Sequence, residues 1–147
     1  MAKKIIISES QLVNLIGKTN MIQEMNVAKM SCSRLTYESM TEFLGGREDK
    51  KLGHNTFVER ISEFEIGIKY HNTYIVKLDP TDIMTVNTGG WDTVTTKGRL
   101  NLFLKCRNVY ISQKNNKWTI HGTNDSLPYQ DGMQVFPNGH VAEPVKR

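Results

Sequence analysis

The chain has 147 residues, of which 38% are hydrophobic and 23% are charged, a composition that is ordinary for a soluble globular protein of one domain. Nineteen Lys and Arg against fifteen Asp and Glu give a net charge of +4, which permits a polyanionic partner but does not by itself indicate nucleic-acid binding. No apolar run reaches the roughly 18 residues of a membrane span or the roughly 7 of a secretory signal, so we expect a cytoplasmic protein without membrane contact.

The sequence pattern of residues 1–35 predicts a helical N-terminal extension. Ser8 and Gln11 have the spacing of a capping box, and apolar residues recur after them at roughly helical spacing. Such a helix could serve docking or homo-oligomerisation. A second helix is predicted over residues 36–44, because two glycines follow it as a stop signal.

From residue 51 onward the apolar period changes to two, which predicts strands near residues 55–61, 66–78 and 82–87. A short helix over residues 95–104, capped by Thr95 or Thr96, and a hairpin over residues 109–121 follow. We therefore predict an α+β fold, a mostly antiparallel β-sheet with one short helix, preceded by one or two N-terminal helices. The sheet and short helix form a core domain of residues 36–136, and residues 137–147 are expected to be a loose C-terminal tail.

The two cysteines, Cys32 and Cys106, show neither Cys-x-x-Cys spacing nor a nearby histidine pattern. Cysteines so placed in a cytosolic protein favour two buried, reduced thiols and argue against a structural zinc site. The His-x3-His spacing of a metal site is missing as well. We expect neither a metal nor a cofactor.

The tripeptide His-Asn-Thr occurs twice, at His54–Thr56 and His71–Thr73, and the residues between the two copies read as a β-hairpin. If the hairpin loop is centred between residues 63 and 64, His54 lies opposite Thr73 and Thr56 lies opposite His71. This register turns all four side chains away from the core. Arg60 and Lys69 would flank them.

Two imidazoles can act as general base and general acid on a phosphodiester, while hydroxyl groups and cations hold its oxygens. His54, His71, Thr56 and Thr73 are therefore candidate catalytic residues, with Arg60 and Lys69 as phosphate ligands and no metal. The alternative is that these are solvent-facing strand positions that tolerate His and Thr. The paired motif resembles the two-histidine phosphoesterases, which cleave cyclic phosphates or 2′,5′-linkages with two H-x-[S/T] motifs, as an analogy of site chemistry.

A second candidate site begins at Thr88-Gly89-Gly90-Trp91. The helix start after it would attract an anion, and Trp91 could stack on a base. The phosphate- or nucleotide-binding candidates here are Trp91, Thr95, Thr96, Lys97 and Arg99. The alternative is a capped helix after a tight turn, with Trp91 as a core residue and the cations solvated.

The sequence between about residues 36 and 136 resembles a family of small bacteriophage and mobile-element proteins. The resemblance rests on Leu44–Arg47, both His-Asn-Thr copies, the block TGGWxTxTTKxRxN at residues 88–101, and Asp131–Met133. It implies a phage-type accessory protein that acts in the host cytoplasm, and it implies no particular activity.

We favour a protein that recognises a nucleotide or another small phosphodiester molecule. A phage could use such a protein to sequester or cleave a host defence signal. Whether the protein is an enzyme stays open. If it is one, it would be a metal-independent phosphodiesterase. One alternative is a nucleic-acid-binding accessory protein that uses Arg60, Lys69, Lys97, Arg99, Trp91 and Tyr110. The other is a virion or structural interaction module without catalysis.

Overall fold

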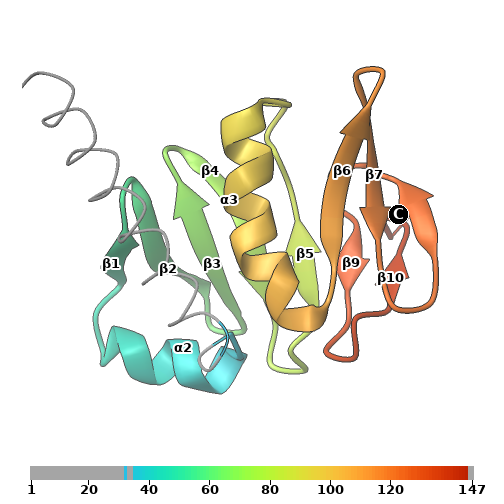
Figure 1. Ribbon diagram of the computed structural model, residues 1–147. Coiled ribbons are helices and arrows are strands. Elements are labelled where there is room, and N and C mark those ends of the chain that lie inside the picture. The colour runs from blue at the N-terminus through green and yellow to red at the C-terminus, as the bar shows by residue number, and fades with distance from the viewer. Residues whose placement is uncertain (1–31, 33–34, 146–147) are drawn as a thin grey trace, which may run out of the picture.

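The computed structural model describes residue 32 and residues 35–145 (Figure 1). The extension predicted over residues 1–35 lies almost wholly outside these described residues. Within them the chain folds as two antiparallel sheets with two α-helices and one short 3-10 helix. The predicted α+β class, mostly antiparallel sheet, is confirmed.

Helix α2 comes first among the labelled elements, and two sheets follow. In chain order the elements are α2 (Tyr37–Leu44), β1 (Asp49–Gly53), β2 (Thr56–Ser62), β3 (Glu65–Tyr70), β4 (Thr73–Leu78), β5 (Met84–Val86), α3 (Val94–Leu104), η1 (Lys105–Arg107), β6 (Tyr110–Lys114), β7 (Lys117–His121), β8 (Ser126–Pro128), β9 (Gln134–Val135) and β10 (Val141–Ala142). The larger sheet has the order β1-β2-β3-β4-β5-β9-β10 and the smaller β6-β7-β8. Val141 is buried in β10, so part of the tail expected to be loose is held by strand pairing.

Helix α2 has the boundaries that its flanking residues predict. The Thr36 side chain accepts a hydrogen bond from the Ser39 amide at 3.1 Å, and Gly45 ends the helix in the left-handed conformation, with φ of 57°. The buried side chains of α2 include Met40 and Phe43. They fix the helix against the sheet.

The N-cap of helix α3 is Thr93, which precedes both predicted cap residues, Thr95 and Thr96. Thr93, with an extended backbone, accepts the hydrogen bond from the Thr96 amide at 3.1 Å. Thr95 and Thr96 are already helical, so neither is the N-cap, and that prediction is wrong. The helix turns Leu100, Phe103 and Leu104 inward, and all three are buried in the core.

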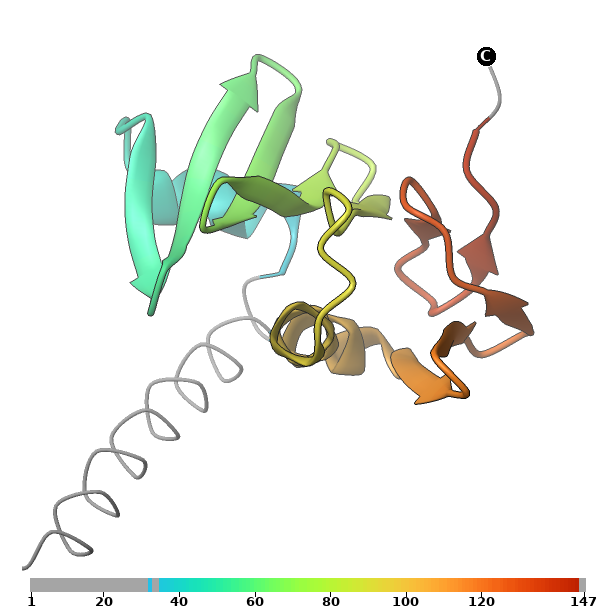
Figure 2. The same ribbon diagram turned by 90° about the horizontal axis from the view of Figure 1, so that it is seen from above.

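Both helices lie on one face of the larger sheet. Lys50, on the same face as the buried Val58 opposite it, places its ammonium 4.5 Å from the ring of Phe43 in α2. Figure 2 shows α3 end-on below β4 and β5. Ile111 and Ile120 of the smaller sheet join the same core.

The β2–β3 hairpin pairs one residue away from the predicted register. Its loop is where we expected it, with Ser62 opposite Glu65. A bulge between Arg60 and Ser62 then shifts the pairing, so that Val58 opposes Ile68. Ile61, the extra residue, lies against Gly67, where a Cβ would come within 2.6 Å of its Cδ1 atom.

That shift reverses the face of β2. Val58 is fully buried and Phe57 is exposed, whereas the predicted register placed Phe57 in the core. The predicted strand over residues 66–78 is also two strands, because the chain turns at His71 and Asn72. His71 has a positive φ of 54°, which a strand cannot accommodate.

The two cysteines form a disulfide. Cys32 and Cys106 are bonded, with their Cα atoms 4.9 Å apart. The expectation of two reduced thiols is therefore wrong. Their sequence separation of 74 gave no local signal, because only the fold brings such distant residues within the reach of a disulfide.

Candidate functional site

Both His-Asn-Thr copies start tight turns rather than lying opposite each other in strands. His54 and Asn55 connect β1 to β2, and His71 and Asn72 connect β3 to β4. The turns meet at one end of the sheet, where the His71 amide donates to the Asn55 carbonyl oxygen at 2.9 Å. The sequence thus correctly predicts that the copies are neighbours.

The predicted opposition of His54 to Thr73 and of Thr56 to His71 is wrong. Thr56 pairs with Tyr70 on one side of β3, and Thr73 pairs with Tyr70 on the other. Thr56 is completely buried, and its hydroxyl donates to the His54 carbonyl oxygen at 2.7 Å. It serves the first turn and is not presented to a ligand.

The structure places the two histidines differently. The exposed His54 ring has its Nε2 atom 3.1 Å from the side-chain nitrogen of Asn55. The His71 ring packs against the Tyr70 ring, with centroids 4.4 Å apart. Only His71 of the two lines the cavity described next.

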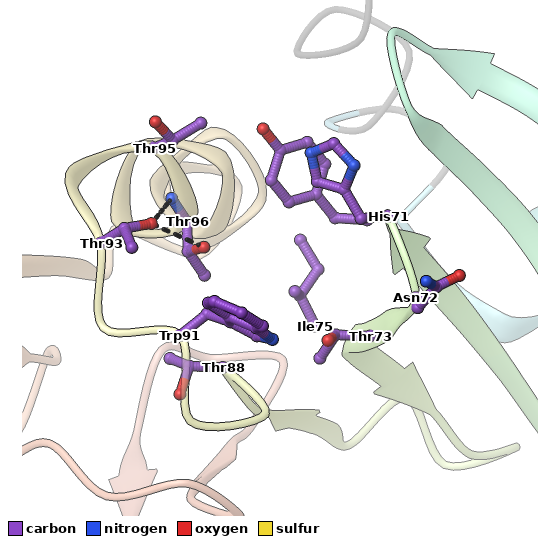
Figure 3. Close-up of a pocket in the computed structure, with 10 residues that line it drawn as sticks. His71, Asn72, Thr73, Ile75, Thr88, Trp91, Thr93, Thr95 and Thr96 are labelled. Carbon is purple, nitrogen blue, oxygen red and sulfur yellow. Dashed lines mark hydrogen bonds between the residues drawn. The ribbon is translucent and has the colours of Figure 1, made fainter.

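A cavity of about 370 Å³ lies between the β3–β4 turn and the start of α3 (Figure 3). It is lined by Tyr70, His71, Asn72, Thr73, Ile75, Thr88, Trp91, Thr93, Thr95 and Thr96. The two segments that the sequence indicated separately, the second His-Asn-Thr copy and the Gly-Gly-Trp loop with its helix start, therefore share one cavity.

The cavity has an apolar floor and polar edges. Figure 3 shows Ile75 between the Trp91 and His71 rings, while Asn72 points away. Trp91 is 65% exposed, so it is not the core residue of the alternative interpretation. Its large aromatic surface is available to a ligand.

The Asp131 carboxylate holds the Gly-Gly-Trp loop in place. Its Oδ1 atom accepts hydrogen bonds from the Thr88 amide at 2.8 Å, from the Thr88 hydroxyl at 2.9 Å and from the Tyr129 hydroxyl at 2.8 Å. Burial, together with the hydrogen bond to Asp131, raises the pKa of Tyr129. Sequence reasoning gave Asp131 no role, and its only signal was its place in the resemblance.

Gly89 brings this loop directly against the second His-Asn-Thr copy. Its φ is +64°, and a Cβ there would lie 2.9 Å from both Oγ1 and Cγ2 of Thr73. Only glycine satisfies the backbone conformation and the close approach together. The loop and the turn thus form one packed unit on the wall of the cavity.

The predicted cationic ligands are divided between different places. Arg60 donates to the Tyr37 hydroxyl at 2.9 Å and the Thr41 hydroxyl at 3.0 Å, so it holds α2 to the hairpin. Lys69 pairs with Glu59 at 3.7 Å. Neither residue lines the cavity.

The two cations of α3 differ as well. Lys97 donates to the Gln113 side chain of β6 at 3.2 Å. Arg99 is buried, and its guanidinium carbon is 4.9 Å from the centre of the Tyr70 ring. Since Tyr70 lines the cavity, Arg99 places a positive charge directly behind the cavity wall.

Among residue 32 and residues 35–145, no three His, Cys, Asp or Glu side chains are grouped so as to hold a metal ion. The described helices are also too short or too polar to cross a membrane. The residues that line the cavity carry hydroxyl groups, aromatic rings and one imidazole.

Comparison with known proteins gives one family. No curated protein and no solved structure matches the chain. The family description of the Kyanoviridae Gp96 protein matches residues 33–136, which is well over half of the 147 residues and includes the whole cavity lining. The chain therefore belongs to the Kyanoviridae Gp96 family of bacteriophage proteins.

Proposed function

We propose that the protein binds a nucleotide, or another small phosphodiester-containing molecule, in the cavity between the β3–β4 turn and α3. The observation that carries this proposal is that exposed Trp91 and the hydroxyl-rich start of α3 line the same cavity of about 370 Å³. Small-molecule sites have volumes of about 300–1,000 Å³, with apolar walls and a few polar groups. A mononucleotide is at the small end of that range.

The aromatic part of such a ligand would stack on Trp91. The opposite side of the cavity offers the rings of His71 and Tyr70, with Ile75 between. Stacking of a base on an aromatic side chain is worth about 1–3 kcal/mol. This term favours a ligand with a planar ring over inorganic phosphate alone.

The phosphate would lie at the N-terminus of α3. Thr93 caps the Thr96 amide, which leaves the earlier amides of Val94 and Thr95 without an intrahelical acceptor. Thr95 lines the cavity beside them, although Figure 3 shows its hydroxyl pointing away from the cavity.

Binding is better supported than two-histidine cleavage. One imidazole, that of His71, lines the cavity, and the hydroxyl of Thr56 is used within the first turn. General acid and base catalysis by a histidine pair needs two imidazoles within reach of one phosphate. A phage protein that sequesters a host nucleotide signal needs only affinity.

The test uses Trp91 as a reporter. In a Trp118→Phe variant Trp91 is the single tryptophan, since the chain has two. This variant is titrated with linear and cyclic mono- and dinucleotides while fluorescence and heat are measured. We expect at least one nucleotide to quench Trp91 and to be released chemically unchanged on denaturation, as mass analysis would show.

The two histidines supply matched controls. His71→Ala should weaken binding about tenfold, which corresponds to the loss of about 1.4 kcal/mol of contact, and His54→Ala should bind as the parent does. If no nucleotide alters fluorescence or releases heat, the proposal fails. A cleaved product that disappears in His54→Ala would instead restore the two-histidine mechanism.

A further inference from the structure

The face of the larger sheet that points away from both helices carries an alternating row of cations and aromatic rings. Strand register defines it: Lys51 opposes Phe57, Phe57 opposes Lys69, and Lys69 opposes Tyr74. Directly opposed residues share a face of the sheet. We call these four residues, on β1, β2, β3 and β4, the open-face row.

The open-face row is accessible in the part of the chain that the structure describes. Lys51 and Phe57 are exposed, and the side chain of Lys69 is 30% exposed. Both helices lie on the opposite, core-facing side of the sheet: the Lys50 ammonium contacts the Phe43 ring of α2 there, and α3 lies over the same side (Figure 2). Phe57 is 37% exposed in a strand with neighbours on both sides, so part of its apolar surface is available to a partner.

Tyr74 is held flat against the sheet by its neighbours. A Cβ on Gly67 would lie 2.7 Å from Tyr74 Cδ1, so the ring covers the glycine. The ammonium groups of Lys69 and Lys77 are 5.6 and 5.9 Å from the centre of the ring. The Tyr74 hydroxyl donates to Glu59.

The charges near the row favour an anion. Lys51, Lys69 and Lys77 share the face with Glu59, which is already engaged by Lys69 and the Tyr74 hydroxyl. Glu65 lies on the same face at the β2–β3 turn, the end of the sheet away from the β3–β4 turn. Asp49 shares the face with Glu59, farther from the β3–β4 turn than Lys51. The cationic end of the face is therefore the end that also carries Phe57 and Tyr74.

We propose that the open-face row binds single-stranded nucleic acid. Lysine ammonium groups would contact successive phosphates, and unpaired bases would stack on Phe57 and Tyr74. These two rings lie two strands apart, about 10 Å at the usual strand spacing, so each can receive its own base. In a duplex the bases are enclosed and cannot reach the rings, which makes strandedness the discriminating property.

This surface is distinct from the cavity, because Tyr70 and Thr73 line the cavity from the core side of the same strands. The inference therefore does not depend on the proposed nucleotide site. It also differs from the nucleic-acid surface expected from the sequence, of which only Lys69 belongs to the row.

The test measures the anisotropy of a fluorescein-labelled oligothymidylate and of a duplex of equal length with the full chain. We expect the single strand to bind more tightly. Phe57→Ala should weaken it by about fivefold or more, the loss of one stacked base. Lys51→Ala should reduce the slope of log affinity against log salt by about one.

Lys117→Ala is the matched control, because Lys117 is an exposed strand lysine of the smaller sheet, and it should bind as the parent does. Circular dichroism and melting temperature check that each exposed-site variant folds. Equal affinity for duplex and single strand, equal effects of Lys51→Ala and Lys117→Ala, or no binding would each overturn the proposal.

Discussion

The two His-Asn-Thr copies have the same three side chains and different structures. In the first copy Asn55 takes the positive φ, of 50°, and in the second His71 does, with 54°. Thr56 is completely buried and bonded to its own turn, whereas Thr73 is half-buried and lines a cavity. The repeat is thus present in the sequence but not in the backbone conformation, because the residue with positive φ is the second of the first copy and the first of the second copy.

This difference shows that the segments packed against a turn determine the role of its residues. The first copy is followed by a strand whose pairing is shifted by the bulge before Ser62. The second is covered by the Gly-Gly-Trp loop, because Gly89 lies against Thr73. Substitutions in the two copies and in the loop test this difference.

The largest effect is expected for Gly89→Ala. The left-handed φ costs about 1–2 kcal/mol for alanine, and displacement of Thr73 adds a comparable amount, so we expect about 3 kcal/mol less free energy of unfolding. Urea unfolding measures it. Gly90→Ala is the control, because its φ of +88° is strained but nothing lies within 4 Å of a Cβ there.

The steric part of that effect can be isolated. In a Thr73→Ala background, Gly89→Ala should cost no more than Gly90→Ala, since both crowded atoms of Thr73 are gone. An unchanged cost would mean that the loop and the second copy are not packed together.

Asp131→Ala should follow, with a loss of about 2 kcal/mol, because it leaves the buried Thr88 amide and the Tyr129 hydroxyl without their acceptor and removes the shorter of two hydrogen bonds of the Thr88 hydroxyl. The Trp91 emission should shift as the loop loosens. Asp92→Ala, which removes a single 3.2 Å bond to the Thr88 hydroxyl, should cost less than half as much. Equal losses of stability in the two variants would show that Asp131 is not the main support of the loop.

A smaller effect separates the threonines themselves. Thr56→Val keeps the buried shape but loses the hydroxyl bonded to the His54 carbonyl oxygen, for about 1 kcal/mol. Thr73→Val should leave the free energy of unfolding nearly unchanged and alter only ligand affinity. Thermal melts measure the stability of the two variants, and titrations of the same samples measure their ligand affinity. A destabilised Thr73→Val beside an unchanged Thr56→Val would contradict these roles.

The smallest effect concerns Tyr74, the residue after the second copy. The hydrogen bond to Glu59, followed by burial, raises its pKa from 10.0 to about 12. The folded state therefore holds this proton more tightly than the unfolded chain does. The resulting stability is fully present below about pH 10 and is lost as the pH rises through about 12.

Tyr74→Phe should remove this alkaline step. A spectrophotometric titration of tyrosinate absorbance, run beside urea unfolding at each pH, measures it in both proteins. Phe57, the residue after the first copy, has no such group. A parent and variant with identical alkaline profiles would show that the Tyr74–Glu59 bond is not significant in solution.

Local signals predicted the local structure. Gly45 ends α2 as expected, and Asn115 and Asn116 form the turn of the β6–β7 hairpin with φ of 52° and 62°, a conformation that asparagine tolerates. The missing parts are nonlocal. Neither the bulge at Ile61 nor the pairing of β9 with β5 has a signature within its own segment.

The same division applies to the candidate site. His71, Thr73, Trp91, Thr95 and Thr96 were each indicated by local chemistry, and they line one cavity. Arg60 and Lys69 were added from a register that the bulge changes, and they serve other contacts. The support by Asp131 depends on a contact across 43 residues of sequence, which no spacing rule anticipates.

The Cys32–Cys106 bond makes the stability of this protein depend on the redox state of its surroundings. A crosslink between residues 74 apart in the chain lowers the conformational entropy of the unfolded chain by an amount worth about 4 kcal/mol. In a reducing medium that contribution vanishes, while the hydrogen bond from the Arg107 guanidinium to the Leu35 carbonyl oxygen, at 3.5 Å, still joins residue 35 to η1. The same molecule would then unfold at a lower denaturant concentration inside a reducing cell than in air-oxidised buffer.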